Sequence, residues 1–181
     1  TGEGTSISQV EKLKTLQTLI KEDILPSKIN ATVITSSLQN AILQCVEYHS
    51  LGVKRILIAP PFFFKDLSFE GLLSWYSAVF TACRSLKIQF ILYNIPQLTM
   101  VAIKPELISA LQSEFGSETI FGVKDSTGNL EGTLEFLKNK DHESSCYIKS
   151  QSLLSFPSFP NQNLLSSCYK NSQKIKDYFF Y

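Results

Sequence analysis

The chain has 181 residues, of which 17 are basic and 16 acidic, so its formal charge is +1. This near-neutral balance gives no reason to expect binding to nucleic acid or to an anionic membrane surface. No apolar run reaches the roughly 18 residues of a membrane span, and residues 1–30 lack the basic-then-apolar order of a signal peptide. The length is sufficient for one sizeable core.

Cysteine and histidine usage is sparse. The cysteines form no Cys-x-x-Cys pair, which is typical of reduced thiols in a cytoplasmic protein. They are Cys45, Cys83, Cys146 and Cys168. The two histidines, His49 and His142, lie far from the motifs described below, so the sequence predicts no metal site.

Short apolar, β-rich runs alternate with helical patterns along most of the chain. The runs predict strands at residues 30–35, 55–59, 88–94, 119–124 and, less clearly, 146–150. Their starts follow one another at intervals of 25, 33, 31 and 27 residues, which is typical of successive strand–helix units. The runs are continuously apolar, as expected for parallel strands covered on both faces.

Helical patterns separate these strands. The predicted helices span residues 8–22, 38–50, 68–85, 104–115 and 130–139. In the first of them Leu13, Leu16 and Ile20 recur at helical spacing. Ser126 or Thr127 is expected to cap the last helix. Alternating units of this kind indicate either a doubly wound sheet or a (β/α)₈ barrel. A phosphate-binding Gly-x-Gly-x-x-Gly pattern follows none of the strands, which argues against a dinucleotide site.

Three motifs stand at the ends of these predicted elements. Tyr93 ends the third strand and is followed by Asn-Ile-Pro, and Lys124 ends the fourth, in the segment Gly-Val-Lys-Asp-Ser-Thr-Gly, 31 positions later. The chain starts with Thr-Gly-Glu-Gly. From Thr1 to about Leu154 the sequence resembles the dihydrodipicolinate synthase / N-acetylneuraminate lyase family, because the three motifs occur in that family's order and spacing.

The resemblance implies an α/β fold, a partial (β/α)₈ TIM barrel that lacks the family's first, second and eighth strands. A complete barrel of this type takes about 250 residues. Residues 1–155 are expected to form the partial barrel domain, from the second helix to the seventh strand. Residues 156–181 are expected to be an irregular tail outside the family pattern. The missing start indicates a processed chain or a fragment.

The family binds pyruvate or a related 2-oxo acid as a lysine Schiff base, without metal or organic cofactor, and the resemblance assigns this role to Lys124. Burial at a strand end favours the neutral amine and can bring the pKa of a catalytic lysine to about 7–8. An isolated lysine at such a position is more often a side chain that extends to solvent. The intact motif around Lys124 favours the catalytic interpretation.

The resemblance gives Tyr93 the role of proton relay, although a lone tyrosine in an apolar strand is more commonly a core residue. It also gives Thr1 and Gly2 the binding of the substrate carboxylate. Asp125 and Glu3 are interpreted as capping or supporting carboxylates, not as an acid–base pair.

Two positions depart from the pattern of true dihydrodipicolinate synthases. Phe63 occupies the aromatic loop that supplies a tyrosine to the neighbouring subunit, and Leu98 replaces an arginine that binds the second substrate's carboxylate. These changes argue against aspartate semialdehyde as that substrate, unless the alignment slips by one residue in the aromatic loop. The family is usually homo-oligomeric.

Three functions remain open at this point. The first is aldol cleavage or condensation of a 2-oxo acid. The second is dehydration or decarboxylation of a sugar-derived 2-oxo acid. The third is a non-catalytic remnant that binds full-length relatives through exposed barrel edges.

Overall fold

A curved parallel sheet of six strands forms the centre of the chain, in a computed structural model that describes residues 4–138, 147–148 and 178–180. The strands are β1 (Ile29–Val33), β2 (Arg55–Ile58), β3 (Gln89–Asn94), β4 (Ile120–Asp125), β5 (Tyr147–Ile148) and β6 (Tyr178–Phe180). Their order across the sheet is β5-β4-β3-β2-β1-β6, and every neighbouring pair is parallel.

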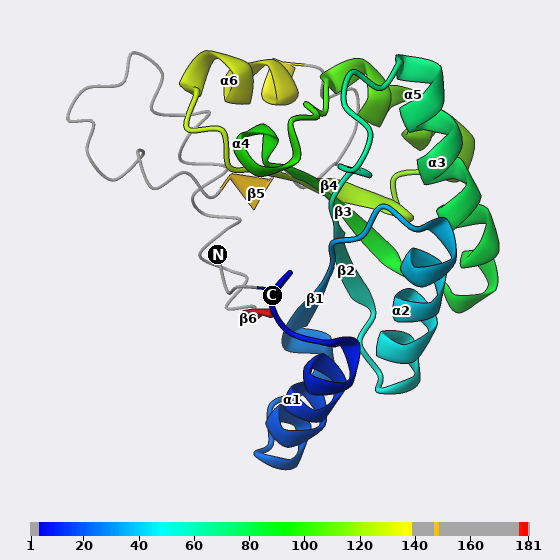
Figure 1. Ribbon diagram of the computed structural model, residues 1–181, viewed down its shortest axis with the longest axis vertical. Helices are drawn as coiled ribbons and strands as arrows, with labels where there is room; N and C mark the ends of the chain where they lie inside the picture. Colours follow the sequence, from blue (N-terminus) through cyan, green and yellow to red (C-terminus); the bar gives the residue numbers. More distant parts are fainter. Residues whose placement is uncertain (1–3, 139–146, 149–177, 181) are drawn as a thin grey trace.

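Helices alternate with the strands from β1 to β5 and lie along one face of the sheet (Figure 1). They are α1 (Gln9–Lys21), α2 (Leu38–Ser50), α3 (Phe69–Ala82), α4 (Pro96–Thr99), α5 (Pro105–Phe115) and α6 (Leu130–Lys138), with short 3₁₀ turns at Pro26–Lys28 and Arg84–Leu86. This repeated strand–helix order confirms the α/β fold and is consistent with part of a (β/α)₈ barrel.

Helix starts follow from local hydrogen-bonding chemistry. The Ser8 side chain accepts a hydrogen bond from the Glu11 amide, and the Glu11 carboxylate accepts one from the Ser8 amide, which closes a capping box on α1. The Ser37 and Ser68 hydroxyls cap α2 and α3 by accepting one hydrogen bond each, from the Asn40 and Gly71 amides. Pro105 starts α5, where its missing N–H costs nothing.

The expected cap of α6 was wrong. Asn129, and not Ser126 or Thr127, caps this helix, because its Oδ1 accepts hydrogen bonds from the Glu131 and Gly132 amides at 3.1 and 3.4 Å. The Thr127 hydroxyl accepts from the Asn129 amide instead, at 3.1 Å. Thr127 therefore shapes the turn that leads into the helix.

The two faces of the sheet carry different cores, because alternate residues of a strand point to opposite faces. Residues such as Ile56, Ile58 and Leu92 pack against the helices in the large core. The opposite face, here called the inner face, carries a smaller buried cluster. That cluster contains Leu57, Ala59, Ile91, Tyr93 and Ile95, with Ile34 and Phe121 packed against it.

Five expected strands are present in the expected order, and the fifth is described at Tyr147–Ile148. The segment expected to be irregular contains one short strand, since Tyr178–Phe180 pairs in parallel with β1. A three-residue run of aromatic residues carried no turn or glycine signal that would have identified it. The rest of residues 156–181 lies outside the described part, so the proposed division of the chain near residue 155 stays a prediction.

Candidate active site

Tyr93 and Lys124 lie side by side at the carboxyl ends of β3 and β4. They are partners in the register of these two strands, and the Lys124 Nζ lies 4.1 Å from the centroid of the Tyr93 ring. Both side chains are buried, with exposed fractions of 1% and 2%. Parallel strands deliver their last residues to one edge, so two positions 31 apart in the sequence meet there. The structure thus brings together the two residues that were predicted to be catalytic.

Apolar residues pack against Tyr93 of this pair. Leu57, Ile91 and Ile95 pack with Tyr93 on the inner face. Burial raises the pKa of the Tyr93 phenol, and a hydrogen bond with the Ser126 side chain lowers it by a smaller amount. The phenol is therefore protonated at neutral pH and can deliver a proton. Deeper along the inner face the Arg55 guanidinium stacks over the Phe121 ring at 5.0 Å.

Directly after this pair, Asn94 and Asp125 form a second register pair on the opposite, helix-bearing face. The Asn94 Nδ2 donates to Asp125 Oδ1 at 2.9 Å, and the Asn94 Oδ1 accepts from the Ile103 amide at 3.0 Å. Both side chains are almost fully buried, at 4% and 1% exposed. From the sequence, Asp125 was expected to have a supporting role, and no role was expected for Asn94. The signal for Asn94 is that it directly follows Tyr93, as Asp125 directly follows Lys124, at the ends of two adjacent strands.

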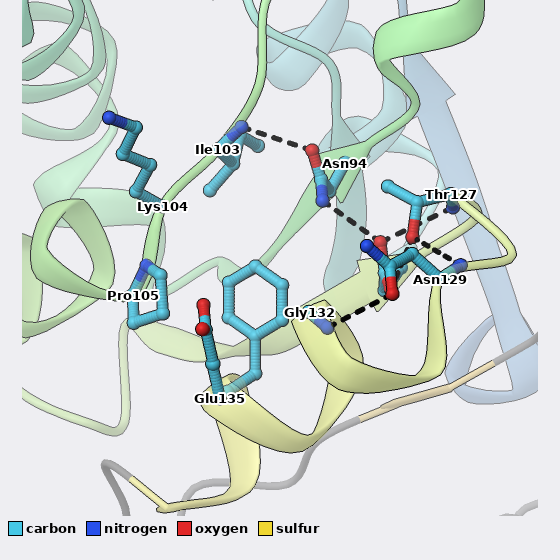
Figure 2. A pocket seen from close by; sticks show the side chains of 10 residues that line it. Asn94, Ile103, Lys104, Pro105, Thr127, Asn129, Gly132 and Glu135 are labelled. Atoms are coloured by element: carbon cyan, nitrogen blue, oxygen red, sulfur yellow. Dashed lines mark hydrogen bonds between the residues drawn. The ribbon is translucent and has the colours of Figure 1, made fainter.

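The Asp125 carboxylate also holds the loop and helix that follow Lys124. Thr127 donates to it twice, from its amide at 3.3 Å and its hydroxyl at 2.9 Å. The Thr133 hydroxyl of α6 donates at 2.5 Å. Figure 2 shows Asn94, Thr127 and Asn129 converging on this network. Gly128, with φ of +74°, makes the tight turn between them, a conformation that suits glycine.

Beside this network lies a cavity of about 140 Å³ on the helix-bearing side of the sheet (Figure 2). Asn94, Asp125 and Thr127 line one side of it, and Glu135 and Phe136 of α6 line another. Its polar wall is already hydrogen-bonded within the protein. The cavity therefore adjoins the support of the Tyr93–Lys124 pair, whereas the pair itself faces the other side of the sheet.

The remaining candidate residues fall in other places. Thr1 and Gly2 lie outside the described residues, so their role in carboxylate binding stays a prediction. Phe63 and Leu98 follow β2 and β3 at the same edge as Lys124, and they are 74% and 65% exposed. Phe63 packs edge-to-face on Phe64, with ring centroids 5.1 Å apart.

Within the described ranges, no three His, Cys, Asp or Glu side chains come close enough together to hold a metal ion. No helix in the same ranges is both long and apolar enough to cross a membrane.

Comparison with known proteins identifies the family of the chain. The model of the dihydrodipicolinate synthetase family matches residues 1–150. A match over this much of the chain shows that the protein belongs to that family, which contains lyases of the (β/α)₈-barrel type.

Individual relatives illustrate the range of the family. The chain is 34% identical over 131 residues to an uncharacterized DapA-like lyase of Chloroflexus aurantiacus, which covers 72% of this chain and 43% of that protein. The crystal structure of dihydrodipicolinate synthase from Agrobacterium tumefaciens superposes with a TM-score of 0.76 at 37% identity, over 81% of this chain and 50% of the other.

A 2-keto-3-deoxygluconate aldolase from Picrophilus torridus superposes with a TM-score of 0.67 at 26% identity, over 80% of this chain and 48% of the other. The chain thus spans about half the length of the proteins that it matches.

Proposed function

We propose that Lys124 forms a Schiff base with the ketone of pyruvate or a related 2-oxo acid, and that Tyr93 moves protons in this reaction. The observation that carries the proposal is the buried contact between the Lys124 amine and the Tyr93 ring at 4.1 Å. An amine becomes nucleophilic when it is neutral, and the burial of Lys124, which is 2% exposed, disfavours its charged form.

The chemistry needs only groups of the chain and the substrate. The lone pair of the neutral amine attacks the ketone carbon, and the carbonyl oxygen leaves as water once it has been protonated. The resulting iminium withdraws electrons from the adjacent carbon, so a carbon–carbon bond there can break to give an enamine, or an enamine can attack an aldehyde. The Tyr93 phenol, protonated at neutral pH, supplies and recovers the protons. Thr1 and Gly2 would bind the substrate carboxylate.

The side chains at this edge favour an uncharged second substrate. Phe63 and Leu98 are uncharged side chains and offer no cation for a second carboxylate. Relatives with matching folds include both a dihydrodipicolinate synthase and a 2-keto-3-deoxygluconate aldolase. We therefore propose aldol cleavage or condensation with a neutral or hydroxylated aldehyde.

A second candidate function is an interaction chain without turnover of its own. One observation favours it: the Asn30 Oδ1 and the Thr32 Oγ1 are buried at the inner face of β1 with no hydrogen-bond partner among the described residues. Further barrel strands from another chain would offer partners to such atoms.

Substrate assays separate these candidates. Cleavage of 2-keto-3-deoxygluconate, followed as pyruvate release, is compared with condensation of pyruvate and aspartate semialdehyde. Lys124→Ala should abolish activity, Tyr93→Phe should lower it about 100-fold, and Lys104→Ala, an exposed lysine of the same edge, should leave it unchanged. Equal activity of Lys124→Ala and the wild type would overturn the proposal, and efficient use of aspartate semialdehyde would overturn the substrate class.

A further inference from the structure

We propose that Asp125 is a positioning residue for this site, whose carboxylate fixes the ends of β3 and β4 so that the Lys124 amine stays against the Tyr93 ring. The inference rests on the proposed Schiff-base function and adds to it the residue that sets its geometry. Asp125 itself lies on the other face of the sheet and does not reach the substrate.

Four hydrogen bonds from three separate segments meet on this one carboxylate. Asn94 donates from the end of β3, Thr127 donates twice from the loop after β4, and Thr133 donates from α6, at distances between 2.5 and 3.3 Å. Hydrogen bonds to an ionised acceptor are about twice as strong as neutral ones. Asp125 therefore ties the end of β3 to the loop after β4 and to α6.

The burial of this network indicates that it serves to fix the geometry of the site. Asp125 is 1% exposed and Thr133 is 3% exposed. A buried polar network is rarely the cheapest way to stabilise a core, because apolar residues of similar volume often serve as well or better. What such a network supplies instead is a fixed geometry, since each donor accepts only a narrow range of positions.

The Asn94–Asp125 pair acts on the Tyr93–Lys124 pair through directly adjacent residues. Asn94 and Asp125 are partners in the register of β3 and β4, immediately after the partners Tyr93 and Lys124. The Ser126 amide continues the ladder by donating to the Asn94 carbonyl at 2.9 Å. If the Asn94–Asp125 pair loosens, the two strand ends can separate and the amine moves from the phenol. A displacement of about 1 Å can reduce the rate of a reaction about 100-fold.

Trapping of the imine tests this role. Pyruvate and borohydride are added, and the initial rate of adduct formation is measured against pyruvate concentration by intact mass. Asp125→Asn keeps the shape but turns one acceptor into a donor, and Thr133→Val removes one hydroxyl. We expect the limiting rate to fall about 10- to 100-fold and about fivefold respectively, while the half-saturating pyruvate concentration changes less than about threefold. Thr133→Ser should restore the wild-type rate.

Glu135→Gln is the matched control, because Glu135 is an exposed carboxylate on α6 beside the same cavity. It should trap at the wild-type rate. Folded Asp125→Asn with wild-type trapping would overturn the proposal, as would an equal loss in Glu135→Gln. If Asp125→Asn does not fold, the difference between Thr133→Val and Thr133→Ser decides the question in the same way.

A second readout separates this inference from the proposed function. The ultraviolet titration of Tyr93, obtained by subtracting the curve of Tyr93→Phe in each background, reports the environment of the phenol without any imine. Water that enters a loosened site should lower the Tyr93 pKa toward its ordinary value in Asp125→Asn, and Glu135→Gln should not change it. Absence of trapping in the wild type would overturn the Schiff base alone, whereas an unmoved Tyr93 titration in Asp125→Asn would overturn the positioning role alone.

Discussion

The carboxyl ends of β3 and β4 differ from β1 in how their buried polar groups are satisfied. At the former, Asn94 and Asp125 hold every polar side-chain atom in a hydrogen bond. In β1, the Asn30 Oδ1 and the Thr32 Oγ1 are buried with no partner among the residues that the structure describes. Both regions belong to one parallel sheet, yet only at the ends of β3 and β4 do these buried polar side chains find all their hydrogen bonds within the described residues.

The contrast between the two regions has consequences for stability and for rigidity. An unsatisfied buried polar atom costs about 1–3 kcal/mol, whereas a fully bonded network rigidifies its surroundings. The β3–β4 end is thus organised by contacts within its own strands, loops and α6. The inner face of β1 carries polar groups whose bonding is not completed by neighbours in the described ranges. Removing a polar group should therefore lower the free energy of unfolding at the ends of β3 and β4, and should leave it equal or raise it in β1.

The largest effect is expected for Asp125→Ala. Removal of the carboxylate leaves the buried Asn94 and the partly buried Thr127 without their acceptor, whereas the Thr133 hydroxyl can still donate to the Asn129 carbonyl. We expect the free energy of unfolding to fall by about 3–5 kcal/mol, because several donors lose their acceptor at about 1–3 kcal/mol each. Urea denaturation measures it, and Glu131→Ala, at an exposed acidic residue of α6, is the control. A loss below about 1 kcal/mol would mean that the network is not part of the stability of this end.

A smaller loss is expected for Asn94→Leu. The leucine fills a similar volume, but the Ile103 amide and the Asp125 carboxylate each lose one partner. The expected destabilisation is about 2 kcal/mol. Denaturant titration measures it, with Lys104→Leu as the control at an exposed position. Equal stability of Asn94→Leu and the wild type would show that the hydrogen bonds at the ends of β3 and β4 do not stabilise the fold.

The pH dependence extends the comparison to phenols. The Tyr76 hydroxyl is buried with no partner among the described residues, and burial holds its pKa well above the usual value. The pKa of Tyr93 is raised as well, but its hydrogen bond with Ser126 opposes the shift.

A folded-state pKa above the unfolded value means that the unfolded chain loses its proton first. The corresponding stability is fully present below about pH 10, the ordinary phenol value, and is lost as the pH rises toward the folded value. The free energy of unfolding should therefore fall above about pH 10, by up to about 1.4 kcal/mol per pH unit for each such phenol. Tyr76→Phe should make the free energy of unfolding fall less steeply with pH above about pH 10. An unchanged slope would contradict a raised pKa for Tyr76.

The smallest effect, of opposite sign, is expected for Thr32→Val in β1. Valine keeps the branched shape and removes the buried Oγ1 that no described residue binds. Stability should stay equal or rise by up to about 1 kcal/mol, because the cost of an unsatisfied hydroxyl disappears. Thr133→Val, which removes a bonded hydroxyl, is the matched comparison and should lose stability. A loss in Thr32→Val as large as in Thr133→Val would show that the Thr32 hydroxyl is bonded in solution.

Much of this fold is predictable from the sequence because the strands are continuous apolar runs at regular intervals. The helix starts at Ser8, Ser37 and Ser68 agree with simple capping chemistry. The meeting of Tyr93 and Lys124 also follows from parallel strands ending at one edge.

Other features depend on tertiary contacts that no local pattern encodes. Asn129 displaces Thr127 as the cap of α6 because Asp125 engages the Thr127 hydroxyl. The four-donor network on Asp125 combines residues from β3, a loop and α6. The pairing of Tyr178–Phe180 with β1 joins segments about 150 positions apart, a contact order beyond any local signal.

Mapping of the borohydride-trapped pyruvate adduct tests the central claim most directly. The wild-type chain is incubated with pyruvate and borohydride, digested and analysed by peptide mass spectrometry. The account predicts one adduct, on the peptide that contains Lys124, its loss in Lys124→Ala, and slower formation in Asp125→Asn. Adducts spread over exposed lysines such as Lys65 and Lys104, with none enriched at Lys124, would contradict it.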